Sequence, residues 1–440
     1  MRSASVSNPL QEGRARPTAD RFLTEGERPF PNAKLGGAAL IVYKSAADLV
    51  SRGALFAITI VAARRLGARE FGLFGLGTTL GWLIAVASDF GVQMHLARAV
   101  AREPAHAFAH LGRWWRFRLG AAAAGVGVFA LGLLLSGASR QMAITLSLFV
   151  AVAITVSFVE LLNYFYRGLD RTDIESGLTA GYRIATLVLA LAALWWRPSV
   201  DLLAVAMLIP AACALAWSRI SANGMAPNGM APNGMGSTRG SRADIHGAFF
   251  GDVFPVGLGI VLSAIYFRVD VLLVQLWSGT EAVAAYNAVF RLIDALRLFP
   301  AAVLAVMLPA LCRAETLRPL ARVAAPVTLF GAAAAAALWL AADRIVPLAF
   351  GSPYAFAAPA FRILALSFPL MCLNFALTHQ LIAWSGQRSY AAVCAAALAL
   401  NVALNAALIP RFAIDGAAWA TLGTEMCVTA GCAAAMRVRP

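Results

Sequence analysis

Charged residues are scarce in this sequence, and acidic ones especially so. Of the 440 residues, 13% are charged and 60% are hydrophobic, and the mean hydropathy is +0.73. A soluble domain has about 25% charged and about 45–50% apolar residues, so this composition indicates a protein with many transmembrane helices. The excess of 36 basic over 22 acidic residues does not indicate a nucleic-acid partner, because most basic residues lie in short segments between apolar runs.

The motifs of nucleotide-dependent and hydrolytic enzymes are absent as well. The chain has no GxxxxGK[ST] loop, no HExxH and no GxSxG. Its six cysteines lie in or at the end of apolar runs and form no CxxC pair, which indicates neither a disulfide framework nor a metal site. We therefore expect no enzyme activity, no catalytic residues, no metal and no cofactor. Any transport would draw on a gradient or on the substrate itself.

Apolar runs of membrane-spanning length fill most of the sequence. A transmembrane helix needs about 20 mostly apolar residues, and the sequence predicts an all-α polytopic membrane protein with about twelve such helices. The predicted spans are 38–62, 72–95, 117–136, 142–166, 174–196, 200–219, 248–277, 283–311, 323–342, 359–384, 389–409 and 413–436. Because the polar stretch before them lacks a short apolar core with a cleavage site, we do not expect it to act as a signal peptide.

Basic residues in the connections alternate in number along the chain. With the N-terminus placed inside, the cytoplasmic segments hold 22 Lys and Arg residues and the opposite side holds 7. Positive residues concentrate on the cytoplasmic side of a membrane, so this split predicts a multi-pass protein whose N- and C-termini are both cytoplasmic.

The longest connection divides the chain into two halves of six predicted spans. It contains the run NGMAPNGMAPNGM, whose density of Gly, Pro and Asn is typical of a flexible linker. The predicted domains are a disordered basic cytoplasmic arm (1–35), an N-terminal six-helix lobe (36–219), the cytoplasmic linker (220–247), a C-terminal six-helix lobe (248–436) and a cytoplasmic tail (437–440).

The turn after the first predicted span resembles the turn after the seventh. Gly67 and Gly279 coincide at an offset of 212 residues, and we expect each glycine to end a helix and open a turn. Six spans per half would give both halves the same orientation. We therefore predict that a pseudo-two-fold axis normal to the membrane relates the two lobes, with a substrate site between them.

Charged residues inside the apolar runs are the candidates for function. The runs Phe250–Trp277 and Val283–Leu311 contain Arg268, Asp270, Arg291, Asp294 and Arg297. A charge at the centre of a membrane helix costs about 2.5–3.5 kcal/mol on insertion scales, and such residues usually face a bundle interior or a water-filled path. The simpler interpretation is a set of structural ion pairs that join helices. For the set as a whole we favour a polar cavity between the halves.

The first span carries a similar set of charges at helical spacing. Lys44, Asp48 and Arg52 follow one another every four residues, which places them on one helix face where neighbours can pair. Asp89 lies inside the second span. With Arg183 and Glu160, which lie inside other spans, six cations face five acids, so the count alone does not predict an anionic substrate. The predominance of arginine favours one, because its planar fork suits phosphate.

Two further stretches are expected to be structural. The segment Leu96–Arg118 carries Arg and His residues between two apolar runs and is predicted to be an amphipathic helix at the membrane interface. Arg118 is counted there among the cytoplasmic loop charges. Asn401 and Asn405 lie four residues apart in the eleventh span, and we expect them to join helices through hydrogen bonds.

Four stretches in order resemble motifs of the bacterial polysaccharide flippases. They are Ala63–Phe74, similar to an R-x-L-G-x-x-x-F-G-x-Y/F turn; Ser88–Gly91 with Arg98, similar to D-x-G…R; Tyr266–Asp270, similar to R-x-D in the seventh helix; and Asn401–Pro410 with Asp415–Ala418, similar to N-x-x-L-N-x-x-L-I-P…G-A-A. On these motifs the chain resembles the Wzx-type oligosaccharide-lipid flippases, whose superfamily also contains the multidrug and toxin extrusion antiporters and the lipid II flippases.

The resemblance implies alternating access and a central cationic cavity. The cavity would take the head group of an isoprenoid-diphosphate-linked oligosaccharide and move it from the cytoplasmic to the outer leaflet. The residues implied to bind the diphosphate-sugar head group are Arg52, Arg268, Arg291, Arg297 and Lys44. Those implied in ion or proton coupling or in charge pairing are Asp48, Asp89, Asp270 and Asp294, with Asp89 or Asp270 pairing with the arginines when the cavity is empty.

The resemblance also implies a setting for the protein. We expect it in the bacterial cytoplasmic (inner) membrane, in lipopolysaccharide or exopolysaccharide biosynthesis, beside a polysaccharide polymerase and glycosyltransferases. Other functions stay open. A cation-coupled multidrug exporter would need an acidic, aromatic pocket, and a lipid II flippase usually has more spans. A non-transporting membrane scaffold and a membrane glycosyltransferase are alternatives from other classes.

Overall fold

The computed structural model describes residues 37–225, 253–312, 318–384 and 386–437. Within these ranges the regular secondary structure is entirely helical, which confirms the predicted all-α membrane fold. The predicted N-terminal arm, nearly all of the predicted linker and most of the predicted tail lie outside the described residues.

The first half of the chain contains seven α-helices and a short 3₁₀ helix. They are α1 (Gly37–Arg65), α2 (Ala68–Asp89), α3 (Val92–Arg102), η2 (Pro104–His106), α4 (Ala107–Leu135), α5 (Arg140–Gly168), α6 (Thr172–Trp196) and α7 (Val200–Gly224). The second half contains α9 (Phe254–Leu296), α10 (Leu298–Cys312), α11 (Arg318–Phe350), η4 (Ser352–Ala357), α12 (Ala358–Ala383) and α13 (Gln387–Arg437).

Ten helical stretches of the described chain are long and apolar enough to cross a membrane. Two of them, α9 and α13, contain an internal turn. Gly279 has φ 81° inside α9, and Ala413 has φ 47° inside α13. A positive φ costs glycine little, so Gly279 lets α9 reverse direction between two apolar segments. Counting α9 and α13 as two segments each gives the twelve spans that the sequence predicts.

The turn at Gly67 differs from its predicted counterpart at Gly279. Gly67 has φ −65° and ψ 158° and precedes α2 in an extended conformation, whereas Gly279 lies in the left-handed region. Both glycines lie at a turn between helical segments as expected, but their backbone conformations differ. The pseudo-two-fold axis stays a prediction.

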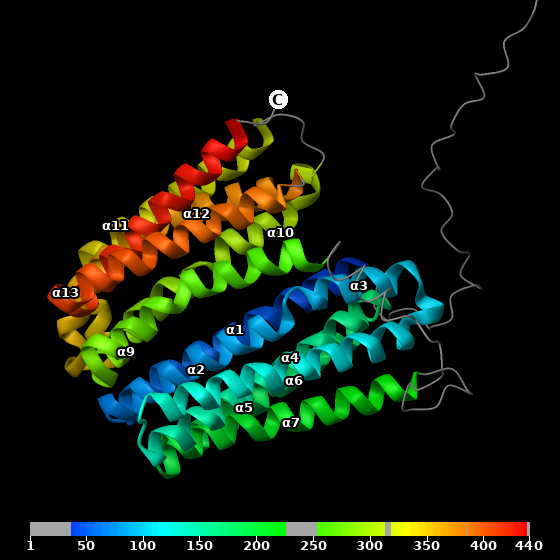
Figure 1. The fold of residues 1–440 in the computed structure, drawn as a ribbon, viewed down its shortest axis with the longest axis horizontal. Coiled ribbons are helices and arrows are strands. Elements are labelled where there is room, and N and C mark those ends of the chain that lie inside the picture. The colour runs from blue at the N-terminus through cyan, green and yellow to red at the C-terminus, as the bar shows by residue number, and fades with distance from the viewer. Residues whose placement is uncertain (1–36, 226–252, 313–317, 385, 438–440) are drawn as a thin grey trace, which may run out of the picture.

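The helices form two bundles that lie side by side, α1–α7 in one and α9–α13 in the other (Figure 1). The beginning of α1 and the end of α13 lie toward the end of the molecule where α3 lies, an arrangement that agrees with termini on one side of a membrane. The bundles meet mainly where α2 packs against α9, a contact we call the seam. A Cβ atom on Gly72 would lie 2.0 Å from the carbonyl oxygen of Thr280, so glycine permits the close approach there.

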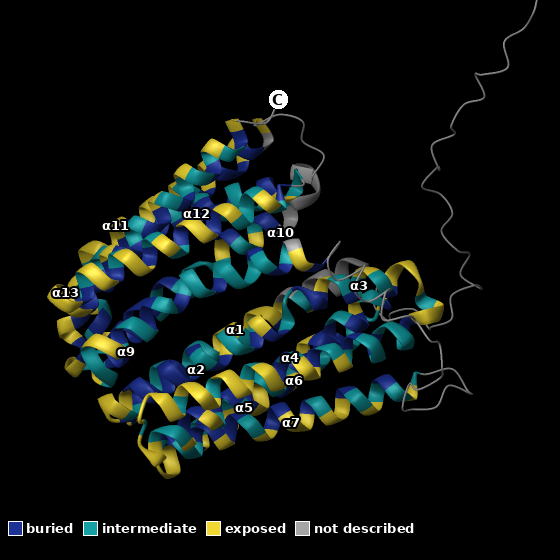
Figure 2. Cartoon of the chain, viewed as in Figure 1, coloured by how far each residue is buried: buried dark blue, intermediate teal, exposed yellow. Residues whose placement is uncertain are grey.

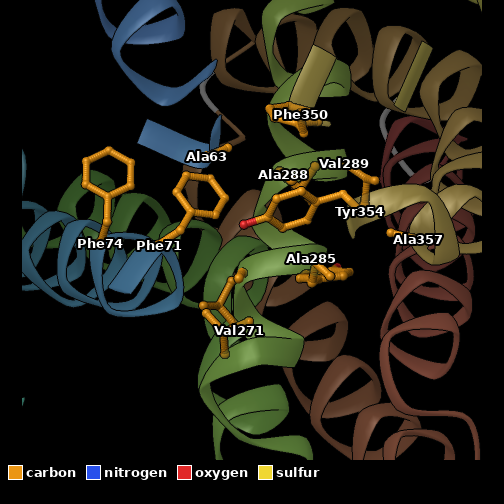
Figure 3. Close-up of a cluster of buried hydrophobic side chains, with 14 of the residues drawn as sticks. Ala63, Phe71, Phe74, Val271, Ala285, Ala288, Val289, Phe350, Tyr354 and Ala357 are labelled. Carbon is orange, nitrogen blue, oxygen red and sulfur yellow. The ribbon is translucent and has the colours of Figure 1, made fainter. Parts of the chain in front are cut away.

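The seam has two different ends. At the end with the α1–α2 turn and Gly279, which we call the turn end, aromatic and small side chains from α2, α9 and η4 pack together (Figure 3). The rings of Phe71 and Tyr354 lie 5.8 Å apart there, edge to face. At the other end, the α3 end, Phe90 lies 5.7 Å from Phe254.

Burial along α1 follows the same division. Ile58 and Ala62 near the turn end are fully buried, whereas Leu49 is 64% exposed toward the α3 end. Figure 2 shows the same change along α1 from buried to exposed residues. The turn end is therefore tightly packed, and the stretch of α1 from Asp48 to Gly53, which we call its uncovered part, is largely exposed.

The predicted interfacial helix Leu96–Arg118 is broken into separate elements. Helix α3 ends at Arg102, and α4 begins at Ala107 and continues through the position of Arg118. Helix α3 is amphipathic, because Leu96 and Val100 are fully buried on one face. Arg118 is fully buried as well, so its assignment to a loop is wrong.

One of the two asparagines joins helical segments as predicted, and the other bonds to it within the same segment. Asn401 donates to the hydroxyl of Thr424 at 3.0 Å, across the turn that divides α13. Asn405 donates to the side-chain oxygen of Asn401 at 2.7 Å. Such interhelical hydrogen bonds stabilise contacts between membrane helices.

Candidate substrate site between the two bundles

Three arginines surround the carboxylate of Asp294 in the second half. Arg268 comes from the first segment of α9 and lies 3.4 Å from Asp294 Oδ2. Arg291 lies 3.7 Å from the same oxygen, and Arg297 lies 3.5 Å from Oδ1. The turn at Gly279 folds the two segments of α9 together and so brings Arg268 to the others. We call these four residues the arginine cluster.

Aromatic rings hold two of these arginines in place. The guanidinium carbon of Arg268 lies 4.4 Å from the ring centre of Phe290, and that of Arg297 lies 4.2 Å from Phe267. The two rings pack edge to face at 5.3 Å. A guanidinium over an aromatic face is attracted by the ring's π electrons, so both cations keep fixed positions without a matching number of carboxylates.

The arginine cluster has hydrogen-bonding capacity to spare. The side chain of Arg268 is 7% exposed, while those of Arg291 and Asp294 are 29% and 30% exposed. Arg268 Nη1 is buried and has no hydrogen-bond partner among the residues that the structure describes. A buried donor without an acceptor is costly, which makes this atom a candidate ligand contact.

Arg52 adds a cation from the other bundle. It is an exposed residue of α1, and it interacts electrostatically with Asp294. Asp270, a buried acid, lies near enough to Arg268 to interact with it. Glu425 on α13, also buried, interacts with Arg297 in the same way. Four arginines therefore share three carboxylates, and this region between the bundles carries a surplus of positive charge.

Asp270 makes its hydrogen bonds away from the arginines. The hydroxyl of Tyr286 donates to Asp270 Oδ2, and the same hydroxyl lies 3.1 Å from that of Thr421 on α13. The acid acting as the direct partner of Arg268 is thus Asp294, which differs from the expectation that Asp89 or Asp270 would have this part.

Asp89 lies in a separate charge pair inside the first bundle. It accepts a hydrogen bond from Arg118 on α4, and Arg118 also donates to the carbonyl oxygen of Ser157 at 3.1 Å. The backbone amides of Gly91 and Gln93 donate to Asp89 as well, at 3.3 and 3.2 Å. We call Asp89 and Arg118 the buried pair, and it joins the end of α2 and the start of α3 to the interiors of α4 and α5.

Lys44 and Asp48 pair along α1 as the spacing predicts, with Nζ 2.8 Å from Oδ1. Lys44 also lies 2.9 Å from Glu175 on α6, which in turn accepts from Arg167 at 2.5 Å. Glu175 is 1% exposed on its side chain, whereas Asp48 is 50% exposed. This network ties the uncovered part of α1 to α6.

Sequence reasoning missed Arg118, Glu175 and Tyr286 as partners of the candidate residues. Arg118 and Glu175 lie close to the predicted ends of spans, where a charge is usually solvated. Tyr286 carries no formal charge, so a search for charged residues inside apolar runs does not find it. Within the described ranges, the structure contains no group of three or more His, Cys, Asp or Glu that could hold a metal ion.

The sequence matches one known protein family. The profile of the polysaccharide biosynthesis protein family matches residues 39–315. No curated protein matches the chain.

Three solved structures illustrate the shared fold. A lipid II flippase, MurJ, in an inward closed conformation is 14% identical, with a TM-score of 0.68 over 91% of this chain and 88% of its own. A multidrug resistance MATE family transporter of the MOP superfamily, facing inward, is 15% identical, with a TM-score of 0.64 over 91% and 100%. A MOP superfamily transporter from Pyrococcus furiosus, described as having a binding pocket of reverse polarity, is 15% identical, with a TM-score of 0.59 over 90% and 94%. At these identities the likeness concerns the fold.

Proposed function

This chain belongs to the polysaccharide biosynthesis protein family, and from that premise we propose that it is a flippase for a lipid-linked oligosaccharide. It moves an isoprenoid-diphosphate-linked glycan from the cytoplasmic to the outer leaflet of a bacterial inner membrane by alternating access. Polysaccharide polymerase and glycosyltransferases are its proposed partners in the same biosynthesis. The fold that it shares with flippases and transporters supports this assignment.

The observation that carries the proposal is the surplus of arginine between the bundles. Arg268, Arg291 and Arg297 share Asp294, and Arg52 approaches from the other bundle. Guanidinium forks bind phosphate oxygens in a bidentate way. A diphosphate head group would supply the acceptors that these arginines lack, beginning with the unpartnered Nη1 of Arg268.

Asp294 has a proposed part in exchange. In the empty protein it is the common partner of three arginines, and an entering diphosphate competes with it for them. Because a ligand shifts a conformational equilibrium only through its different affinity for the two states, release of Asp294 offers a way to couple head-group binding to movement of α9.

We propose different roles for the other charged candidates, Lys44, Asp48, Asp89 and Asp270. Asp48 lies on the uncovered part of α1 and Lys44 one turn before it, where we propose a first contact for the head group. Asp270 remains a candidate for ion or proton coupling, since it is buried next to the arginine cluster. Asp89 is engaged with Arg118, and we propose a structural part for it.

The charge of the site distinguishes this function from the alternatives. A multidrug exporter for organic cations needs an excess of acidic groups in its cavity, whereas arginines outnumber carboxylates by four to three here. A lipid II flippase would present the same head-group chemistry, so the sugar separates it from the proposed function.

The first experiment measures head-group binding without the need to know the sugar. The full chain is purified, and its thermal unfolding is followed with undecaprenyl diphosphate, undecaprenyl monophosphate or undecaprenol. We expect the diphosphate to raise the unfolding temperature most and the alcohol least, because a ligand of the native state stabilises it. Equal shifts for all three lipids would contradict a diphosphate site.

The second experiment tests transport with a matched control. The gene is deleted in its own host, and surface polysaccharide is scored after complementation with wild type, Arg268→Ala and Arg362→Ala at equal membrane abundance. Arg362 pairs with Asp343 at 2.5 Å within the second bundle, away from the arginine cluster. We expect loss of polysaccharide with Arg268→Ala only. Equal activity of both variants would remove Arg268 from the proposed site.

A further inference from the structure

The turn end of the seam contains a cavity to which both bundles contribute. Its volume is about 690 Å³. Arg64 and Gly67 line it from the first bundle, and Glu281, Phe350 and Tyr354 line it from the second. A cavity between two bundles changes shape when the bundles move apart, so its polar contacts are candidates for controlling that movement.

Arg64 makes the most direct polar contact across this end. Its Nε donates to the carbonyl oxygen of Ala349 at 2.9 Å, and its Nη2 donates to that of Leu348. Both oxygens belong to the last turn of α11, where helical partners run out. The carbonyl of Pro347 in the same turn is taken by the amide of Gly351 at 2.8 Å. Arg64 thus supplies two missing donors and places a positive charge at the negative end of a helix.

Asn287, a short distance along the seam, has a side chain without hydrogen-bond partners, in contrast to Arg64. Its side chain lies against α2, because a Cβ atom on Gly75 would lie 2.5 Å from its Nδ2. The residue is 2% exposed, and neither its Nδ2 nor its Oδ1 has a partner among the described residues. A buried amide without hydrogen bonds is unfavourable, and water entering an opened seam would satisfy both atoms.

We propose that the turn end of the seam is a gate in which Arg64 holds the bundles together and Asn287 favours their separation. The two residues act in opposite directions on one equilibrium, which keeps the closed and open states close in free energy. The proposal rests on the proposed alternating-access function, since opening at this end is one half of that cycle. It also assigns a physical part to the arginine of the A63–F74 turn motif.

A buried reporter on the same face of α9 measures the opening. Thr280, Ala284 and Asn287 share one helix face by their spacing, and Ala284 is fully buried. The full chain with its six cysteines replaced by alanine or serine receives Ala284→Cys. It is reconstituted in nanodiscs, and the rate of reaction with a membrane-impermeant maleimide is measured without substrate.

Arg64 and Arg65 provide a matched pair of variants. Arg65 is the next residue along α1, and it lies 4.1 Å over the ring of Trp195 within its own bundle. Loss of two hydrogen bonds from a charged donor is expected to raise the labelling rate at least about fivefold in Arg64→Ala, with Arg65→Ala close to the parent. Arg64→Lys is expected to lie between them, because a lysine cannot donate in a fork.

Asn287→Leu supplies the opposite test. Removing the unpartnered amide while keeping the volume is expected to lower the labelling rate below that of the parent chain. Equal labelling rates in Arg64→Ala and Arg65→Ala would contradict the proposal that Arg64 holds the bundles together. Faster labelling in Asn287→Leu than in the parent chain would contradict the proposal that Asn287 favours their separation. Because no substrate is present, these results are independent of whether the chain carries a lipid-linked glycan. Circular dichroism on each variant confirms that a change in rate is not unfolding.

Discussion

The buried pair in the first bundle and the arginine cluster in the second are built from the same residue types and differ in balance. In the buried pair one arginine, fully buried, meets one aspartate that also accepts two backbone amides. In the arginine cluster three arginines share one aspartate, and three of the four side chains are between about a quarter and a third exposed. The arginine of the first arrangement is fully buried, whereas the second has more arginines than acids and is partly exposed to a ligand.

This difference teaches how to separate structural from functional charges inside a membrane. Burial alone does not do so, since Arg118 is more deeply buried than Arg291. The number of buried donors without acceptors does not do so either, because Arg118 Nε and Arg268 Nη1 both lack a partner among the described residues. The useful quantity is the local surplus of one sign: arginines outnumber acids around the arginine cluster, whereas Arg118 pairs with Asp89 and also interacts with Glu160. By this quantity, the arginine cluster is the site and the buried pair is a joint between helices.

The largest effect is expected from breaking the buried pair. Arg118→Ala leaves Asp89 as a buried acid without its cation, which typically costs about 3–5 kcal/mol. We expect a large fall in the free energy of unfolding and little folded protein in membranes, measured by thermal unfolding and by size-exclusion in detergent. The double variant Arg118→Met with Asp89→Leu should recover part of the loss. If Arg118→Ala were as stable as wild type, the structural interpretation would be wrong.

Breaking the arginine cluster should instead cost binding. Arg268→Ala removes a charged donor of the proposed head-group site, worth about 1.5–3 kcal/mol, or about 10- to 100-fold in affinity for undecaprenyl diphosphate. Stability should change less than in Arg118→Ala, because Asp294 keeps two other arginines. Binding measured by fluorescence anisotropy checks this, with Arg362→Ala as the control. A large loss of stability with unchanged affinity would place the cluster in the same class as the buried pair.

The variant Tyr286→Phe tests whether Asp270 is a structural charge, like the buried pair, or part of the ligand-binding site. The variant deletes a hydroxyl that donates to the buried Asp270, and an acceptor left short of a donor costs about 1–2 kcal/mol. We expect a moderate fall in unfolding temperature with nearly unchanged lipid affinity, since Asp270 turns away from the arginines. A fall in affinity without a fall in stability would instead make Asp270 part of the binding site.

The smallest effect is expected at Arg52, which is exposed and acts across the seam. Arg52→Ala should weaken head-group binding about two- to threefold at low ionic strength. The difference in affinity should disappear near 0.5 M salt, because electrostatic interactions between exposed charges then reach over only a few Å. A difference independent of salt would mean that Arg52 contacts the ligand directly in a shielded site.

The fold could be predicted because apolar length alone decides where a membrane helix forms. The short turn around Gly279 was visible as a break between two apolar runs, and the pairing of Lys44 with Asp48 followed from helical spacing. The buried position of Arg118 could not be read in this way. A charge next to a polar segment is normally solvated, and only Asp89 and the carbonyl of Ser157, distant in sequence, make its burial possible.

The candidate site was predicted in part. Spacing of three residues along α9 was enough to expect contacts between Asp294 and its neighbours Arg291 and Arg297. The third partner, Arg268, lies 26 residues away in sequence and reaches Asp294 because the chain reverses at Gly279. The reversal of the chain determines which acid is shared by several arginines. This acid could therefore not be identified from composition or from local spacing.

The second segment of α9 connects the seam mechanically to the arginine cluster. Thr280, Asn287, Arg291 and Asp294 follow one helix face, so the contact with Gly72 and the arginine cluster lie on one rod, about 21 Å apart at 1.5 Å per residue. Under the proposed function, a displacement of this segment at the arginine cluster is transmitted to its contact with Gly72, so that head-group binding and opening of the seam are mechanically linked.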